Sequence, residues 1–478
     1  MPSLLVKTPD TFLSERRYVM DLIIKNWLGI EYEHHIWQEA YSQIEVSDNQ
    51  ELTLGMPDIF FQTPEKIWLT DHSLPTLPLP LMNLENHLDE IPLTNSRIPI
   101  IFGCNNLGAT SQRKWQQTQP FLWENDKDSY LGIDIFGSAF FMLTLYEDYV
   151  KSDRDQHDRF PSTASLAYQN GFLDRPIINE YIEILWWCMK RLWPRLERKK
   201  LSFRTSVSHD VDMPFAQAFT APTQLIRKCG GDIFKRNSLR LAYNRFSTWQ
   251  SVKRGNYKQD PNYTFDRIMD ISEQYNIKSA FYFKTTCTNT VYDDDYPIDH
   301  LFIRKLMREI NSRGHEIGLH TSYETYQNMG QTKAEFQKLL QVCQEEGIHQ
   351  DQWGGRQHFL RWKVPCTWRN WAEAGLNYDS SLSYAGHSGF RCGVCYDFPV
   401  FDLEQRKQLS LIERPLIIME GSVLGEQYMG LNGQVALNFM AELKARCRLY
   451  EGNFTLLWHN SSFTEAANWA MYESLLKA

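Results

Sequence analysis

The chain has 478 residues, of which 42% are hydrophobic and 14% aromatic, and a formal net charge of −8. This length and apolar content suffice for two packed domains and exclude an intrinsically disordered protein. An acidic chain without a recognised nucleic-acid-binding module also argues against nucleic-acid binding.

The N-terminal residues lack the pattern of a signal peptide, because Asp21, Lys25 and Asn26 interrupt the apolar runs. No segment approaches the roughly 20 uninterrupted apolar residues that a membrane-spanning helix needs. Nine scattered cysteines are typical of a protein in a reducing compartment. We therefore expect a cytoplasmic protein without a transmembrane segment.

Residues 1–200 predict a separate α/β or α+β domain whose sequence shows no chemical signature. Helical periodicity marks residues 15–29 and 134–152, and short strand-like pieces lie between them. A strongly amphipathic helix is predicted within 176–200, and we place the domain boundary at its end.

From residue 201 onward, strand-like segments alternate with helical ones. The predicted strands lie within residues 202–212, 277–286, 314–322, 352–360, 376–384, 414–423 and 453–460. Apolar strands that alternate with helices favour a parallel sheet, either open or closed into a barrel.

Ionisable and polar residues follow the ends of five of these strands. They are His209, Asp210, Asp212, His320, Arg356, His358, Asp379, His459 and Asn460. Because the carboxyl ends of parallel strands meet at one edge of a sheet, we expect these side chains to lie together. Burying so many ionisable groups is costly unless they pair or hold a cation.

A divalent metal site is predicted among these residues. Asp210 and Asp212 project to the same face of a strand, where their mutual repulsion favours a proton or a cation. His320 ends another strand, and Glu324 follows four residues later, where a turn into a helix would bring the two side chains together. An Asp, a His and a third ligand suit a catalytic Zn²⁺ or a related ion. Glu324 and His358 are both candidates for the third ligand.

Residues 201 to about 465 resemble the polysaccharide deacetylase family, carbohydrate esterase family 4, also called the NodB-homology domain. The resemblance rests on SHDVD, IKSAFYF, GHEIGLHTSYE, GGRQHF, YDSS and LLWHN, which occur in the family's order. It implies a distorted (β/α) barrel of about seven strands in residues 201–478. The chain also resembles a divergent bacterial branch that has an extra N-terminal domain.

The resemblance implies a role for each motif residue. Asp212 and His320 match metal ligands, and Glu324 stands where the family has a second metal-binding histidine. Zinc is the expected metal, with cobalt, nickel and manganese as alternatives.

The remaining motif residues match the catalytic groups of the family. Asp210 matches the catalytic base, Arg356 the arginine that pairs with it, His459 the general acid, and Asp379 an acid that tunes this histidine.

These roles imply a metal-dependent hydrolase that removes N-acetyl or other N-acyl groups from amino sugars. The substrate would be a bacterial surface polysaccharide or its precursor. The alternatives are a cyclic amide hydrolase of the same fold and a degenerate glycan-binding module.

A basic insertion interrupts the catalytic half between residues 215 and 258. It contains nine basic residues and one acid, for a charge of +8, which leaves −16 for the rest of the chain. It is either a solvated insertion or a surface for an anion, such as the phosphate of a linked sugar or a peripheral contact with an anionic membrane.

Overall fold

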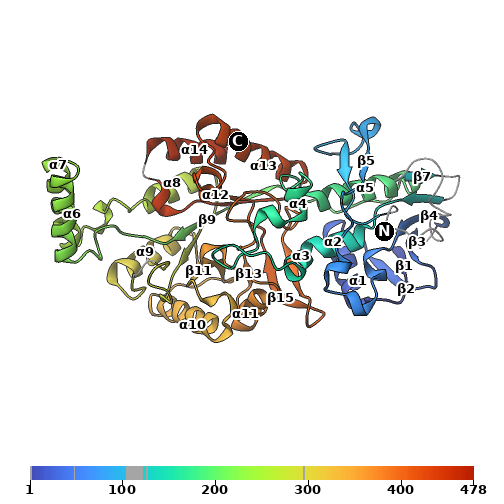
Figure 1. Ribbon diagram of the computed structural model, residues 1–478, viewed down its shortest axis with the longest axis horizontal. Coiled ribbons are helices and arrows are strands. Elements are labelled where there is room, and N and C mark those ends of the chain that lie inside the picture. The colour runs from blue at the N-terminus through green and yellow to red at the C-terminus, as the bar shows by residue number, and fades with distance from the viewer. Residues whose placement is uncertain are drawn as a thin grey trace.

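The computed structural model of the protein describes residues 3–47, 49–103, 122–124, 128–293, 296–463 and 465–477. The N-terminal and C-terminal halves lie side by side along the long axis, and a helical hairpin projects from the far end of the C-terminal half (Figure 1). Each half has its own main sheet, and the predicted separate N-terminal domain is confirmed.

The N-terminal half contains a six-stranded sheet in the order β2-β1-β3-β4-β8-β7 and a two-stranded ribbon of β5 and β6. The strands are β1 (Leu4–Thr8), β2 (Tyr32–Ile36), β3 (Tyr41–Val46), β4 (Asn49–Pro57), β5 (Leu81–Asn83), β6 (Arg97–Pro99), β7 (Leu122–Glu124) and β8 (Asp128–Leu131). The helices are α1 (Leu13–Met20), α2 (Ile135–Leu143), α3 (Tyr146–Val150), α4 (Leu166–Gln169) and α5 (Ile177–Leu192). Leu4, Val6 and Thr8 alternate toward the interior of this half, as a half-buried strand requires.

The C-terminal half contains a nine-stranded sheet in the order β14-β15-β13-β12-β11-β10-β9-β17-β16. The strands are β9 (Arg204–Val211), β10 (Ala280–Phe283), β11 (Glu316–Thr321), β12 (Gly354–Gln357), β13 (Tyr378–Asp379), β14 (Phe398–Asp402), β15 (Lys407–Glu413), β16 (Ile418–Met419) and β17 (Asn453–Leu457). All neighbours are parallel except the β14–β15 pair. The α/β class is confirmed, with a sheet curled into a half-barrel.

The helices of the C-terminal half lie between these strands in the chain or follow them. They are α6 (Pro222–Phe234), α7 (Leu239–Lys253), α8 (Phe265–Gln274), α9 (Leu301–Ser312), α10 (Met329–Glu345), α11 (Cys366–Ala374), α12 (Glu420–Leu424), α13 (Gly433–Leu449) and α14 (Ala466–Lys477). The chain adds β10 to β13 on one side of β9 and returns to place β17 and β16 on its other side. The carboxyl ends of these parallel strands therefore share one edge of the sheet.

The two halves share one hydrophobic core. Buried side chains from α1, α2 and α5 and from the nine-stranded sheet form a single continuous cluster. Tyr18 on α1 donates a hydrogen bond to the carbonyl of Pro399 at 2.8 Å, and buried Asp148 pairs with buried Arg391. The predicted boundary at residue 200 falls between α5 and β9.

No helix in the described ranges combines the length and the apolar composition of a membrane span. No disulfide joins the described cysteines to one another, and Cys104 lies outside the described residues.

Candidate active site

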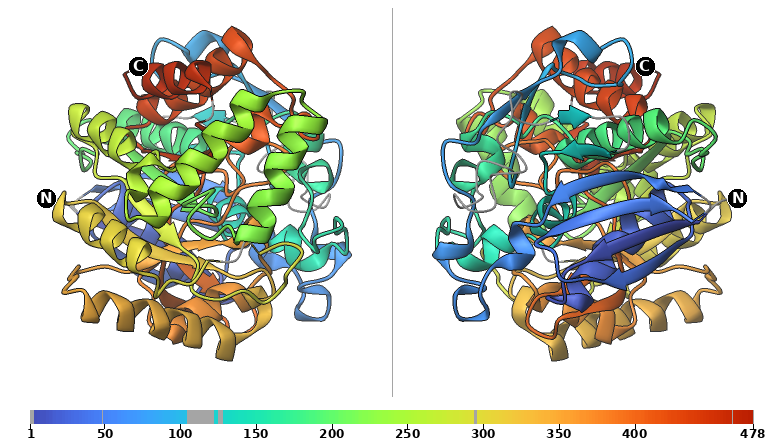
Figure 2. Two further views of the ribbon diagram at one scale, coloured as in Figure 1. Left: turned by 90° about the vertical axis from the view of Figure 1, so that its left-hand side faces the viewer. Right: turned by 90° about the vertical axis from the view of Figure 1, so that its right-hand side faces the viewer.

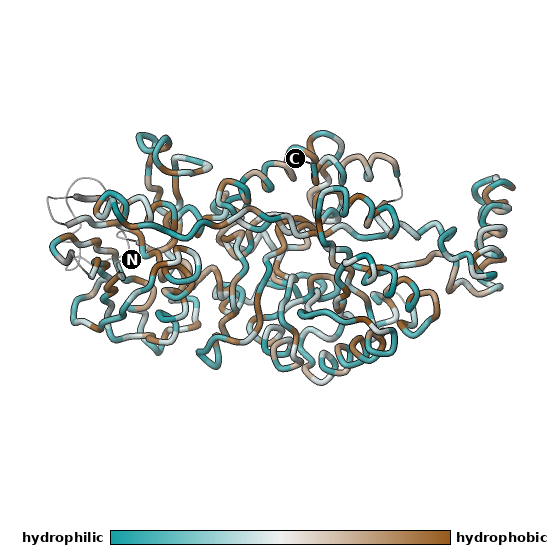
Figure 3. The backbone as a smooth tube through the Cα atoms, turned by 180° about the vertical axis from the view of Figure 1, so that it is seen from behind, coloured by the Kyte–Doolittle hydropathy of each residue, from teal (hydrophilic) through white to brown (hydrophobic). Residues whose placement is uncertain are grey.

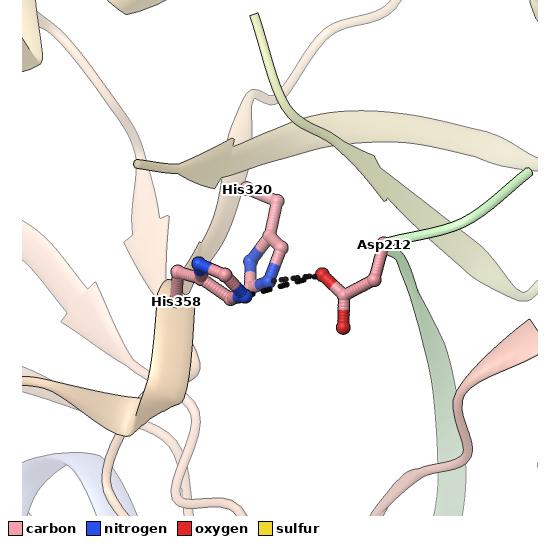
Figure 4. Close-up of side chains that lie close together, drawn as sticks. All are labelled: Asp212, His320 and His358. Atoms are coloured by element: carbon pink, nitrogen blue, oxygen red, sulfur yellow. Dashed lines mark ion pairs between the residues drawn. The ribbon is translucent and has the colours of Figure 1, made fainter. Parts of the chain in front are cut away.

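Asp212, His320 and His358 come together at the carboxyl edge of the nine-stranded sheet. Each follows or ends a different strand, β9, β11 or β12 respectively, and the three side chains point toward one another (Figure 4). One ligand atom from each residue lies within 4.8 Å of the others. Both histidines are buried, whereas the Asp212 side chain is 19% exposed, which leaves the group open to solvent on one side.

Hydrogen bonds fix the orientation of both imidazoles. His320 Nδ1 lies 2.9 Å from the carbonyl oxygen of Arg356, and His358 Nδ1 lies 2.8 Å from Asp293 Oδ1. Because both oxygens are acceptors, each Nδ1 carries a proton, and the neutral ring presents a lone pair at Nε2. Metal-binding histidines are oriented in this way by groups behind them.

The electrostatics of the group also suit a cation. Among the described residues, neither Asp212 Oδ1 nor His320 Nε2 has a hydrogen-bond partner although both are buried. Burial opposes ionisation of Asp212, but His358, His320 and Lys284 hold the pKa of its carboxyl well below the usual range. Burial lowers the pKa of His358, which keeps its imidazole neutral.

Lys284 is a site residue that the sequence analysis did not identify. It follows β10, its side chain is 2% exposed, and its Nζ lies 3.6 Å from Asp212 Oδ1. Within the described ranges this ammonium has no hydrogen-bond partner. A fixed positive charge therefore stands beside the three ligands.

Glu324 does not join this group. Its carboxylate accepts hydrogen bonds from Arg361 at 2.7 Å and Asn289 at 3.2 Å, and its side chain is 47% exposed. The expected pairing with His320 fails because Glu324 precedes a short 3-10 helix, Thr325–Gln327, instead of lying within a helix with His320. Of the two candidates for a third ligand, the structure brings His358 to the group.

Asp210 lies beside the group and is paired with Arg356. Arg356 donates to Asp210 Oδ1 at 2.7 Å, to Ser208 Oγ at 2.9 Å and to the carbonyl of Ser380 at 2.7 Å, and it is fully buried. Burial opposes ionisation of Asp210, but the Arg356 guanidinium lowers the pKa of its carboxyl. Asp210 Oδ2 is 3.8 Å from His320 Nε2, so this carboxylate is adjacent to the ligands.

His459 follows β17 and faces the group, and its acidic partner is Glu420. Glu420 Oε1 accepts hydrogen bonds from His459 Nδ1 at 2.7 Å, from the His459 backbone at 3.0 Å and from Ser462 Oγ at 2.7 Å. Burial favours the neutral imidazole, but Glu420, Asp212 and Asp210 raise the pKa of His459 to about 10. His459 Nε2 lies 3.7 Å from Asp212 Oδ2.

Asp379 was expected to be this acidic partner, and the structure places it elsewhere. Its Oδ1 accepts hydrogen bonds from the backbone and hydroxyl of Ser381, and no hydrogen bond among the described residues joins it to His459. The reason is the strand order, since β13 and β17 are separated by β12, β11, β10 and β9. Glu420 instead follows β16, which pairs directly with β17. At its own position, Asp379 is buried, and this burial raises the pKa of its carboxyl to about 6.

An arm from the N-terminal half, residues 151–165, contacts the loops of this site. Figure 1 shows the arm, in dark teal, running from α3 toward the strands of the C-terminal half. Arg159 Nη1 donates to the carbonyl of Phe359 at 2.7 Å, His157 Nδ1 lies 2.9 Å from Tyr323 Oη, and Arg361 donates to the carbonyl of His157 at 2.8 Å. The arm thus holds the residues directly after His358.

That loop has an unfavourable backbone. Phe359 and Leu360 have φ angles of 61° and 52°, in the left-handed region that bulky side chains rarely adopt. Such a conformation persists only where its surroundings hold it. The Arg159 hydrogen bond to Phe359 is one such restraint from the N-terminal half.

A cavity of about 450 Å³ lies between the arm and the C-terminal half. Arg159, Tyr168 and Leu360 line it together with His387 and Tyr428. Leu360 also belongs to a small apolar cluster with Met419 and Leu457, which directly precede Glu420 and Trp458. Leu360, two residues after His358, therefore links the lining of the cavity to the residues around the site.

The half-barrel of parallel strands brings a group that could hold a cation, a carboxylate and an imidazole to one edge, an arrangement that suits a hydrolase. Residues 256–364 match the family model described as Polysaccharide deacetylase. The chain therefore carries a polysaccharide deacetylase domain and is a hydrolase that acts on amide bonds. The match includes His320, Arg356 and His358, and Asp210, Asp212 and His459 lie outside it.

The N-terminal half matches a different family model. Residues 4–194 match a model described as Family of unknown function (DUF7033), which agrees with an additional N-terminal domain. No curated protein sequence matches the chain.

Solved structures with similar folds were also found. A protein assigned as a polysaccharide deacetylase from Mycobacterium smegmatis is 16% identical, with a TM-score of 0.37, and the match covers 58% of this chain and 84% of the other. Puue allantoinase is 12% identical, with a TM-score of 0.34 and coverage of 58% and 83%. A protein assigned as a polysaccharide deacetylase from Pseudomonas aeruginosa PAO1 is 13% identical, with a TM-score of 0.33 and the same coverage.

Proposed function

We propose that this protein hydrolyses the N-acetyl group of an amino sugar in a surface polysaccharide or its precursor, with a divalent cation at Asp212, His320 and His358. The observation that carries the proposal is the convergence of these ligands with two proton-transfer groups, Asp210 and His459. Each of the two is held in its charged form by a buried partner, Arg356 or Glu420 respectively.

The three ligands fit a divalent cation of the zinc class. Two imidazole Nε2 atoms and one carboxylate oxygen form a mixed nitrogen and oxygen set, and both imidazoles are already oriented from behind. When bound, such a cation supplies Lewis acidity, which polarises a carbonyl group and acidifies water. Zinc is the metal we expect, and the same ligands suit cobalt, nickel or manganese.

The reaction needs a base for water and an acid for the leaving amine. Asp210, kept ionised by Arg356, would accept a proton as the water oxygen bonds to the carbonyl carbon. His459, kept protonated by Glu420, would give its proton to the amide nitrogen as the C–N bond breaks. The products are acetate and a free amino sugar, and Asp210 and His459 then exchange protons with solvent to restore their starting states.

The cavity beside the site supports a sugar as substrate. It combines polar groups that can hydrogen-bond to hydroxyls, such as Arg159 and His387, with the ring of Tyr168, which can stack on a sugar face. We infer that the N-terminal arm contributes to sugar binding, and that residues 1–200 and 201–478 act as one catalytic unit.

The test is acetate release from N-acetylglucosamine oligomers, measured by NMR with the Zn²⁺-loaded protein. The wild type should release acetate, and His459→Ala should be slower by about 10²–10⁴ while it retains its metal. His349→Ala, which removes an exposed histidine from the loop before β12, at the opposite end of the strand from His358, should behave as the wild type. The proposal fails if the wild type releases no acetate from N-acetylated sugars, or if His459→Ala loses its metal together with its activity.

A further inference from the structure

The α6–α7 hairpin projects from the body and exposes several large apolar side chains. It leaves the body through the loop after Asp212 and returns to α8. Figure 1 shows it at the extreme end of the long axis, and in the left view of Figure 2 both helices lie across the front of the molecule. The predicted basic insertion is therefore an ordered projection.

The hairpin is held together by a small interior. Leu225, Ala242 and Val252 are buried, and the buried Asp232 carboxylate pairs with Arg236 at 2.6 Å and Arg245 at 2.5 Å. This pairing neutralises the hairpin's one acid, Asp232.

The base of the hairpin is fixed to the body. Trp249 Nε1 donates to the carbonyl of Thr220 at 2.9 Å, and Lys253 Nζ donates to the carbonyl of Ala218 at 2.8 Å. These contacts hold the base, and the turn between α6 and α7 is the free end.

Large apolar side chains are exposed on both helices, mainly toward this free end. Phe234 is 87% exposed and Leu239 is 73% exposed, on either side of the turn, and Ile226 and Tyr243 are 72% and 71% exposed. Leu239, Tyr243 and Phe246 lie four and three residues apart, so they share one face of α7. Figure 3 shows hydrophilic and hydrophobic residues mixed in this hairpin. Exposed apolar surface of this kind marks an interaction site.

Positive charge surrounds these apolar side chains. Among the described residues, the side chains of Arg227, Lys235 and Arg240 have neither a hydrogen bond nor an ion pair. Lys235 directly follows Phe234, and Arg240 directly follows Leu239. The remainder of the chain is acidic. An anionic surface would therefore attract the hairpin and repel the body, which fixes the direction of approach.

We propose that the α6–α7 hairpin docks on an anionic phospholipid bilayer, with Phe234 and Leu239 entering the interface and Lys235 and Arg240 contacting the headgroups. Apolar and aromatic side chains beside lysine and arginine are the composition that binds peripherally to anionic bilayers. Because the hairpin leaves the body through the loop that follows Asp212, docking would hold the candidate active site near the membrane. The docking itself does not depend on the proposed reaction.

The test is flotation of the full-length protein with vesicles of phosphatidylcholine, alone or mixed in equal parts with phosphatidylglycerol. The wild type should bind the mixed vesicles and leave the neutral ones unbound. A Phe234→Ser/Leu239→Ser variant and a Lys235→Gln/Arg240→Gln variant should each bind at least about tenfold more weakly, and salt should weaken binding of the wild type more than of the second variant. The matched control is Leu301→Ser/Val435→Ser, which removes exposed apolar side chains from α9 and α13 and should bind as the wild type does.

Absence of binding to mixed vesicles, or equal binding by the wild type and the apolar variant, would overturn the proposal. Self-association of the wild type that the apolar variant loses, without vesicle binding, would assign the surface to a second copy and also overturn it. Acetate release from a soluble oligosaccharide should be the same in wild type and hairpin variants. That assay separates failure of docking from failure of the proposed function.

Discussion

The Glu420 carboxylate keeps His459 in its charged form, and this contact governs the pH range of the reaction. A general acid must carry a proton, so activity should fall as the pH rises through the pKa of His459, about 10. Glu420→Gln removes the negative charge beside the imidazole and lowers this pKa. The alkaline limb of the profile of kcat against pH should then move to lower pH by at least about one unit.

Asp379→Asn is the matched control for that measurement, because it removes a second buried carboxylate that lies behind Arg356. The alkaline limb should stay in place in this variant. An unmoved limb in Glu420→Gln, or an equal displacement in Asp379→Asn, would contradict the assignment of Glu420 as the partner of His459.

Lys284 competes with a bound cation for the Asp212 carboxylate, since its ammonium stands 3.6 Å from Asp212 Oδ1. Lys284→Met removes a buried positive charge from the site and keeps a side chain of similar length. The Kd for Zn²⁺, measured by calorimetry, should fall by about tenfold or more. Lys278→Met, an exposed change just before β10, should leave the Kd as it is, and an unchanged or higher Kd in Lys284→Met would show that Lys284 does not oppose the metal.

At the scale of elements, the arm restrains the loop that carries His358. Arg159→Ala deletes the hydrogen bond to the Phe359 carbonyl, and the left-handed residues after His358 lose a restraint. We expect the Kd for Zn²⁺ to rise by about tenfold, the effect of one hydrogen bond from a charged donor. Thr163→Ala in the same arm should have the Kd of the wild type. An unaltered Kd in Arg159→Ala would show that the arm does not contribute to metal binding.

Much of the C-terminal half could be predicted from its sequence, because buried parallel strands appear in a sequence as short apolar runs between helical segments. Asp210, Asp212, His320, Arg356, His358 and His459 all follow or end strands that the pattern identified. His358 is close to His320 because β11 and β12 pair with His320 opposite Arg356. That register requires the pairing of two strands and cannot be read from spacing along the chain.

The role of Glu420 as the partner of His459 could not be predicted, for a related reason. It follows the predicted strand in 414–423, but its value as a partner for His459 depends on β16 lying next to β17. That placement follows from the return of the chain across β9, which no local pattern encodes. The contacts of the arm could not be predicted either, because they join residues about 200 positions apart, as in the hydrogen bond from Arg159 to Phe359.

At the scale of the whole molecule, the two halves are joined by a common core and by a buried ion pair. Arg391→Met leaves the Asp148 carboxylate buried without its partner, which should lower the free energy of unfolding by about 3–5 kcal/mol in urea denaturation. The matched control is Arg446→Met, which breaks the partly exposed pair with Asp174 and should cost less than about 1 kcal/mol. Equal effects of the two changes would contradict the importance of the buried pair.

The different charges of the hairpin and the body would orient the molecule on an anionic surface. The acidic body carries the site, and the basic hairpin projects from the loop that follows Asp212. If both proposals hold, the protein would act on sugars that are presented at a membrane surface.

The most direct test of the account is the metal content of the purified protein, measured by mass spectrometry for the wild type, His358→Ala and Glu324→Ala. We predict about one divalent ion per chain in the wild type and in Glu324→Ala, and none in His358→Ala, because two histidines and Asp212 form the site. A metal that His358→Ala retains, or that Glu324→Ala loses, would contradict this ligand set. A wild type that takes up no metal even after addition of Zn²⁺ would contradict the proposed metal-dependent mechanism.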